Sequence, residues 1–205
     1  MSEFEHVFQP GDGPWTLLLL HGTGGDEHDL VPLGRQLVPA ANLISPRGKV
    51  LENGVSLRFF RRLAVGELDI PDLHHRTDEL AGFVTESAAT YSFDPERVIA
   101  LGLSNGANIA VSLLFRHPGL LRAAALLRPM LPYEPDGDLD LDGTDVLIAA
   151  GGRDPYVPSS ESVALGKELE AHNAGVTMHL NPESGHGLTE GDLVETSRWL
   201  TEITA

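Results

Sequence analysis

Three residues of types that combine in nucleophilic catalysis occur along the chain in the order Ser104, Asp154 and His186. Ser104 is the centre of the sequence GLSNG at 102–106, a G-x-S-x-G pattern. A serine hydroxyl becomes a competent nucleophile when a histidine accepts its proton and a carboxylate orients that histidine. The three residue types therefore predict acyl transfer through a covalent intermediate on the serine.

The segments on both sides of Ser104 are those expected of a nucleophile elbow. Residues 98–101 (VIAL) are apolar throughout, which is typical of a strand covered on both faces. Apolar residues recur at helical spacing between 109 and 114, so a helix is expected after the serine. Gly102 and Gly106 allow that strand and helix to approach closely. Taken alone, the motif also fits a plain turn whose serine caps the helix.

A second glycine-rich turn follows another buried strand, expected over residues 15–20. Its sequence is HGTGGD at 21–26. It does not match the G-x-G-x-x-G pattern of dinucleotide-binding loops, because position 27 is glutamate, and it lacks the lysine of a P-loop. It fits an H-G-x-G loop that supplies a backbone amide to an oxyanion hole. We expect the amides of Thr23 and Asn105 to be the donors, with a purely structural glycine turn as the alternative.

Asp154 and His186 each follow a predicted strand directly. Strand 146–150 leads into GGRDPYVP at 151–158, and strand 176–180 precedes ESGHGL at 183–188. Asp154 also fits an Asx turn before proline, and a lone loop histidine is commonly just a polar surface residue. The chain order of the three residues, each placed after a strand, favours the catalytic interpretation.

The remaining segments alternate between strands and helices, as in an α/β fold with a mostly parallel sheet. Strands are expected at 42–46 and 123–127, and helices at 29–38, 71–91, 159–171 and 192–203. Residues 47–66 have poor periodicity and are expected to form a long loop. This loop holds a basic cluster, RFFRR at 58–62, which either binds a carboxylate of the substrate or, as we favour, pairs with neighbouring acids. Phe60, Met130 and Leu131 are candidate substrate contacts.

Length and composition favour one domain over residues 1–205, since 205 residues with 41% apolar content suffice for one sizeable core. No apolar run approaches the roughly 18 residues of a membrane span. The acidic N-terminal segment does not resemble a signal peptide, so we expect a cytoplasmic protein. The formal net charge of −16 disfavours nucleic acid and anionic membranes as partners. The chain has no cysteine, and no metal or cofactor is expected.

Together, the elbow, the H-G-x-G loop, GGRDPYVP and SGHG resemble the α/β-hydrolase fold. More narrowly, GLSNGANIA and RFFRRLA resemble the bacterial branch of the small carboxylesterase and phospholipase family that includes acyl-protein thioesterases. The resemblance covers essentially the whole chain. The thioesterase branch has glutamine after the nucleophile where this chain has Asn105. This difference argues against protein thioesters and lysophospholipids as substrates, and not against hydrolysis.

The resemblance implies a carboxylesterase-type serine hydrolase. A hydrolase of 205 residues has little chain left for a separate lid, so we expect a minimal lid or none and a preference for small or short-acyl esters. Two other classes stay open: a C–C hydrolase or perhydrolase with the same three residues, and a binding protein that kept the fold without turnover. Activity on a ring-cleavage product but not on simple esters would distinguish a C–C hydrolase or perhydrolase from an esterase. Failure of a fluorophosphonate to label Ser104 would favour the second. Family members often form homodimers, and no segment of this sequence marks an interface.

Overall fold

The computed structural model describes residues 4–64, 66–135 and 137–205. The first three residues of the acidic N-terminal segment, Val65 of the predicted long loop and Asp136 therefore lie outside the described residues.

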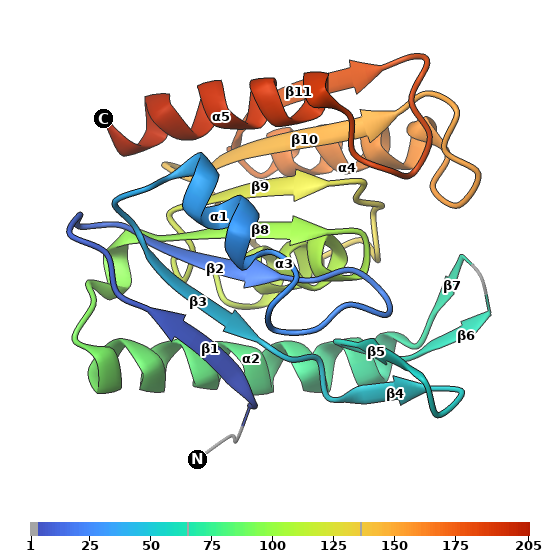
Figure 1. Ribbon diagram of the computed structural model, residues 1–205. Coiled ribbons are helices and arrows are strands. Elements are labelled where there is room, and N and C mark those ends of the chain that lie inside the picture. Colours follow the sequence, from blue (N-terminus) through green and yellow to red (C-terminus); the bar gives the residue numbers. More distant parts are fainter. Residues whose placement is uncertain (1–3, 65, 136) are drawn as a thin grey trace.

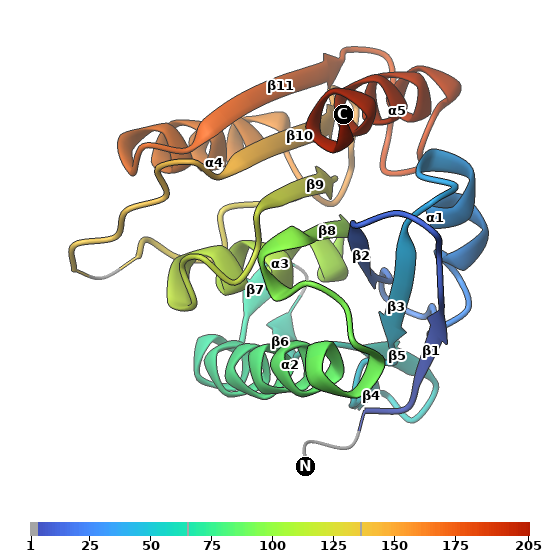
Figure 2. The same ribbon diagram turned by 90° about the vertical axis from the view of Figure 1, so that its left-hand side faces the viewer.

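A seven-stranded sheet runs through the molecule in the order β1-β3-β2-β8-β9-β10-β11 (Figures 1 and 2). All neighbouring strands pair in parallel except β1, which runs antiparallel to β3. The strands are β1 (His6–Gln9), β2 (Thr16–Leu20), β3 (Asn42–Pro46), β8 (Val98–Leu103), β9 (Ala123–Leu127), β10 (Asp145–Gly151) and β11 (Gly175–Asn181). The predicted strands are confirmed to within one or two residues. The edge strand β1 was not predicted, because its residues are half-buried and form no apolar run.

The central strands are apolar on both faces because both faces are covered by helices. In β2, all five residues are buried, and Leu18 aligns with Ile44 of β3 and with Ala100 of β8. Helices α1 (Val31–Leu37) and α5 (Glu190–Thr204) pack on one face, and α2 (Ile70–Tyr91), α3 (Asn105–Arg116) and α4 (Ser159–Ala171) on the other. A 3-10 turn, Pro95–Arg97, leads into β8. The prediction of a mostly parallel sheet flanked by helices is confirmed.

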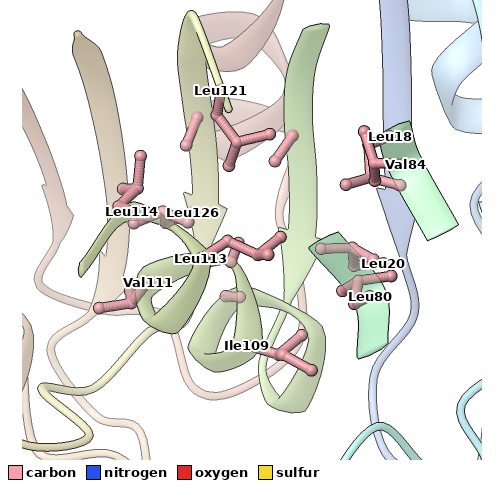
Figure 3. Close-up of a cluster of buried hydrophobic side chains, with 14 of the residues drawn as sticks. Leu18, Leu20, Leu80, Val84, Ile109, Val111, Leu113, Leu114, Leu121 and Leu126 are labelled. Atoms are coloured by element: carbon pink, nitrogen blue, oxygen red, sulfur yellow. The ribbon is translucent and has the colours of Figure 1, made fainter. Parts of the chain in front are cut away.

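Two apolar clusters, one on each face, hold these layers together. The larger one joins β2, β8 and β9 to α2 and α3, and Figure 3 shows Leu18 and Leu20 beside Leu80 and Val84 of α2. Side chains of α3, among them Ile109 and Leu113, fill the same layer. The helix after the serine is therefore anchored in the core along its length. Among the described residues, no helix combines the length and apolar character needed to cross a membrane.

The segment expected to be one long loop forms two small hairpins instead. Strands β4 (Val50–Glu52) and β5 (Ser56–Arg58) form one, and β6 (Arg62–Ala64) and β7 (Glu67–Leu68) form the other. Strands of two or three half-buried residues carry too little periodicity to be found in sequence. In Figure 1 both hairpins lie toward the end of the sheet to which the central parallel strands point.

Candidate active site

Ser104 lies where β8 turns into α3, as the motif predicts. Its backbone has φ 53° and ψ −109°, a conformation that is strained for a residue with a side chain. The turn is held on both sides. The N–H of Ser104 donates to the carbonyl of Leu127 at 2.8 Å, and its carbonyl accepts from the N–H of Asn108 at 2.9 Å. These hydrogen bonds to the sheet and the helix stabilise the strained turn. The turn in return exposes the hydroxyl of Ser104.

The two glycines of the motif are required by the close crossing of strand and helix. A Cβ on Gly102 would lie 2.6 Å from the carbonyl oxygen of Gly106 and 2.8 Å from the backbone of Ala107. A Cβ on Gly106 would overlap the carbonyl group of Leu20 in β2. Both contacts involve backbone atoms, which cannot move aside as a flexible side chain can. The glycine spacing in the sequence therefore has a direct steric cause.

The structure brings the three predicted residues together in one chain of hydrogen bonds. Nε2 of His186 lies 2.9 Å from Oγ of Ser104. Nδ1 of the same ring lies 2.7 Å from Oδ2 of Asp154. The residues come from the loops after β8, β10 and β11, whose carboxyl ends meet at one edge of the sheet. With a proton on Nδ1, Nε2 is free to accept the serine proton.

The surroundings of Asp154 favour its ionised form. Its side chain is 1% exposed, and burial alone would raise its pKa. The N–H groups of Tyr156 and Val157, which donate to Oδ1 at 2.8 and 3.1 Å, and the His186 ring outweigh burial and hold the pKa of Asp154 below its ordinary value. Asp145 begins strand β10, at the end opposite to the loop that holds Asp154, and pairs with Arg122 at 3.0 Å. It is therefore not a substitute partner for the histidine.

The H-G-x-G loop lies beside the elbow, because β2 and β8 are neighbours in the sheet. The chain leaves β2 for β3 on one side and later crosses to β8 on the other, and ligands of open α/β sheets bind at such switch points. His21 fixes the loop: Nε2 accepts the N–H of Gly48 at 2.9 Å, so Nδ1 carries the proton and donates to Gly22 O at 2.7 Å. Burial lowers the pKa of His21, consistent with this neutral form.

The residue that holds the histidine loop, Arg128, was not found from the sequence. Its side chain is fully buried and its backbone has φ 59°. The guanidinium donates to the carbonyls of Gly185 (Nε, 3.0 Å) and Gly187 (Nη2, 2.9 Å), on either side of His186. Nη2 also lies 2.6 Å from a carboxylate oxygen of Asp192, which is buried as well. An arginine after a strand gives no sequence signal of such a role, because its partners lie more than 55 residues away along the chain.

Replacement of Arg128 by methionine is expected to lower the free energy of unfolding by about 3–5 kcal/mol, because it leaves the buried carboxylate of Asp192 without its partner. Denaturant titration followed by circular dichroism measures this loss. Arg198→Met is the matched control: that arginine is exposed on α5, and its ion pairs with Glu195 and Glu202 are expected to contribute less than about 1 kcal/mol. Equal losses of unfolding free energy in both variants would contradict the role of Arg128 in holding the loop around His186.

A cavity of about 250 Å³ opens onto the serine. Its described lining contains Thr23, Arg58, Arg62, Gly66, Leu68, Ser104, Asn105, Asn108, Met130, Tyr156, Val157 and His186. Thr23, Asn105 and Met130 lie where the sequence analysis expects site residues. Tyr156, whose ring packs edge-on against the His186 ring at 5.2 Å, was not expected there. The two arginines belong to the basic cluster, for which a substrate contact was the less favoured of the two alternatives.

Two of the predicted substrate contacts lie elsewhere. Phe60 has no exposed surface and belongs to the apolar core, so it does not line the cavity. Leu131 packs against the same core and is not among the described residues of the lining. Among the described residues, no group of three or more histidine or acidic side chains is arranged to hold a metal ion.

Comparison with known proteins places this arrangement in a family. The sequence model of the Dienelactone hydrolase family matches residues 66–194, which is more than half of the chain and includes Ser104, Asp154 and His186. The chain belongs to the dienelactone hydrolase family. MhqD of Bacillus subtilis (strain 168), a candidate hydrolase, is 44% identical over 198 residues, which cover 97% of this chain and 98% of MhqD.

Solved structures of carboxylesterases agree with this family assignment. The Bacillus cereus carboxylesterase superposes with a TM-score of 0.93 at 47% identity, over 97% of this chain and 94% of that one. The Mesorhizobium loti carboxylesterase gives a TM-score of 0.87 at 35% identity, over 93% and 90% of the two chains. The α/β-hydrolase fold expected from the motifs is confirmed, and this member of the dienelactone hydrolase family is a hydrolase.

Proposed function

We propose that the protein is a serine hydrolase that cleaves carboxylic esters or lactones with small acyl groups through an acyl-enzyme on Ser104. The observation that carries the proposal is the continuous hydrogen-bonded series from Asp154 through His186 to Ser104, at a cavity wall. Membership of a hydrolase family and the similarity to carboxylesterases support the same reaction class.

In the first half of the reaction, Oγ of Ser104 attacks the ester carbonyl while His186 accepts the hydroxyl proton. The imidazolium then gives that proton to the departing alcohol, which leaves the acyl group bound to the serine. In the second half, His186 deprotonates a water molecule, the water attacks the acyl-serine, and the acid and the free serine are released. Asp154 stabilises the imidazolium and keeps the proton of Nδ1 in place.

The backbone amides of Thr23 and Asn105 are the proposed donors to the oxyanion. Both residues line the cavity beside Ser104, and Asn105 is the first residue of α3, where the helix dipole favours negative charge. The side chain of Asn105 accepts the N–H of Phe59 at 2.7 Å and so ties the elbow to β5. Each donor is expected to contribute about 10²–10³ in rate.

The size of the cavity supports small substrates. A volume of about 250 Å³ lies just below the usual range for ligand pockets, roughly 300–1,000 Å³. The walls are formed by short loops and by the hairpins β4–β5 and β6–β7, with polar side chains beside few apolar ones. A long acyl chain would find little apolar surface to cover it.

A series of p-nitrophenyl esters from acetate to dodecanoate tests the proposed preference, with dihydrocoumarin added as a lactone. We expect kcat/KM to be highest for acetate to butyrate and to fall by about tenfold or more by dodecanoate, because the added methylenes stay in water. A maximum at long chains would contradict the small-acyl preference. Absence of turnover across all esters and the lactone would contradict the hydrolase mechanism itself.

A further inference from the structure

An exposed aromatic side chain at the cavity has no place in the reaction as described. Tyr156 is 59% exposed, and it lines the cavity together with Ser104 and His186. Among the described residues of the lining, it is the one phenylalanine, tyrosine or tryptophan. Single apolar residues are common on protein surfaces, so it is the position of this ring that gives it meaning.

The ring of Tyr156 lies against the proposed catalytic base. Its centroid is 5.2 Å from that of the His186 ring, and the two planes meet at 79°. In the proposed reaction His186 gives a proton to the departing alcohol, so the oxygen of that alcohol must come within about 3 Å of Nε2. The group bonded to this oxygen therefore extends away from the histidine ring and within reach of Tyr156. Tyr156 thus adjoins the leaving-group side of the site.

The loop that carries Tyr156 holds the ring in place through its backbone. The N–H groups of Tyr156 and Val157 both donate to Oδ1 of Asp154, at 2.8 and 3.1 Å. Val157 is buried, and Pro155 and Pro158 stand on either side of the pair. An aromatic side chain on a fixed loop loses little conformational freedom when a ligand covers it. Because these contacts do not use the side chain of Tyr156, its replacement leaves them intact.

We propose that Tyr156 is a specificity-determining residue that packs against the leaving group, and that the preferred substrates are esters of alcohols with an aromatic ring close to the ester oxygen. This inference rests on the proposed serine hydrolase function and specifies its substrate class on the alcohol side. Aromatic rings pair edge-to-face or offset with their centroids about 4.5–7 Å apart, and such pairs are more favourable than the area they bury. A saturated ring of the same size gains only the burial.

The test compares benzyl acetate with cyclohexylmethyl acetate. Both leaving groups are primary alcohols of similar basicity, so the intrinsic reactivities of the two esters are close. The cyclohexylmethyl group is the more apolar of the two, so simple burial in the cavity would favour it. We expect the wild-type kcat/KM, measured by acid release in a pH-stat, to favour benzyl acetate by about 2- to 10-fold. A ratio of one or less would overturn the inference.

Substitution of the tyrosine locates the effect. Tyr156→Leu keeps an apolar side chain without the aromatic ring, and it is expected to bring the ratio to one or less. Tyr156→Phe is the matched control and is expected to keep the wild-type ratio, because the ring and not the hydroxyl makes the contact. If the ring only holds His186 in place, Tyr156→Leu would slow both acetates equally and leave their ratio as in the wild type. That result would overturn the inference.

A binding measurement keeps the inference separate from the reaction. In the Ser104→Ala protein, which retains Tyr156, an NMR titration is expected to show benzyl acetate binding about twofold or more tightly than cyclohexylmethyl acetate. Adding Tyr156→Leu to this variant is expected to remove the difference. Equal binding of the two acetates to the Ser104→Ala protein would overturn the role of Tyr156 even if esters are hydrolysed. Conversely, selective binding without ester turnover in the wild type would overturn the proposed hydrolase function and leave the contact with Tyr156 standing.

Discussion

Replacement of Ser104 by alanine is expected to lower kcat for p-nitrophenyl acetate by about 10⁵-fold or more, to the level of the surrounding site without a nucleophile. The hydroxyl oxygen is the atom that attacks, and Ser104 is the one residue of the described lining whose side chain is hydrogen-bonded to His186. Steady-state release of p-nitrophenolate measures the loss.

The fold of this variant is expected to be unchanged. Alanine keeps the Cβ, so the backbone strain at φ 53° is the same, and the bonds of residue 104 to Leu127 and Asn108 use only backbone atoms. The unfolding midpoint in denaturant is the control. Retained esterase activity in a folded variant would assign the nucleophile to another residue.

Replacement of Asp154 by asparagine is expected to lower kcat by about 10⁴-fold with a smaller change in KM. The amide nitrogen of asparagine donates where the carboxylate accepts, so it favours the histidine tautomer with its proton on Nε2. That tautomer cannot accept the proton of Ser104. The same substitution also removes the negative charge that stabilises the imidazolium.

Asp145→Asn is the matched control for this result. Asp145 begins strand β10, at the end of that strand far from the loop that holds Asp154, and pairs with Arg122. Its replacement is expected to change kcat by less than about threefold, as for surface substitutions away from the site. If Asp154→Asn retained wild-type kcat, a different group would have to orient His186.

The parts of this protein that could be predicted from sequence are those set by short-range patterns. Apolar runs on both sides of the turns located β2, β8 and β10, because strands covered on both faces have no polar alternation. The glycines around Ser104 were predictable because strand and helix backbones touch there. Once the sheet was known to be parallel, the loops after these strands had to meet at one edge.

The parts that escaped prediction depend on contacts between distant segments. Arg128 acts through carbonyls of the loop around His186, and nothing near it in the chain indicates that contact. The basic cluster was expected to pair with local acids. Arg61 pairs with Asp69 and Arg62 with Glu52, and Arg62 also lines the cavity together with Arg58.

The proposed covalent intermediate on Ser104 is tested most directly by the site at which a fluorophosphonate reacts. The reagent phosphonylates a serine whose hydroxyl is activated by a histidine, and mass spectrometry of the digested protein locates the adduct. We expect one adduct, on the peptide containing Ser104, and much slower labelling of Asp154→Asn. An adduct on a different residue, or an unlabelled protein that still hydrolyses esters, would contradict the proposed intermediate.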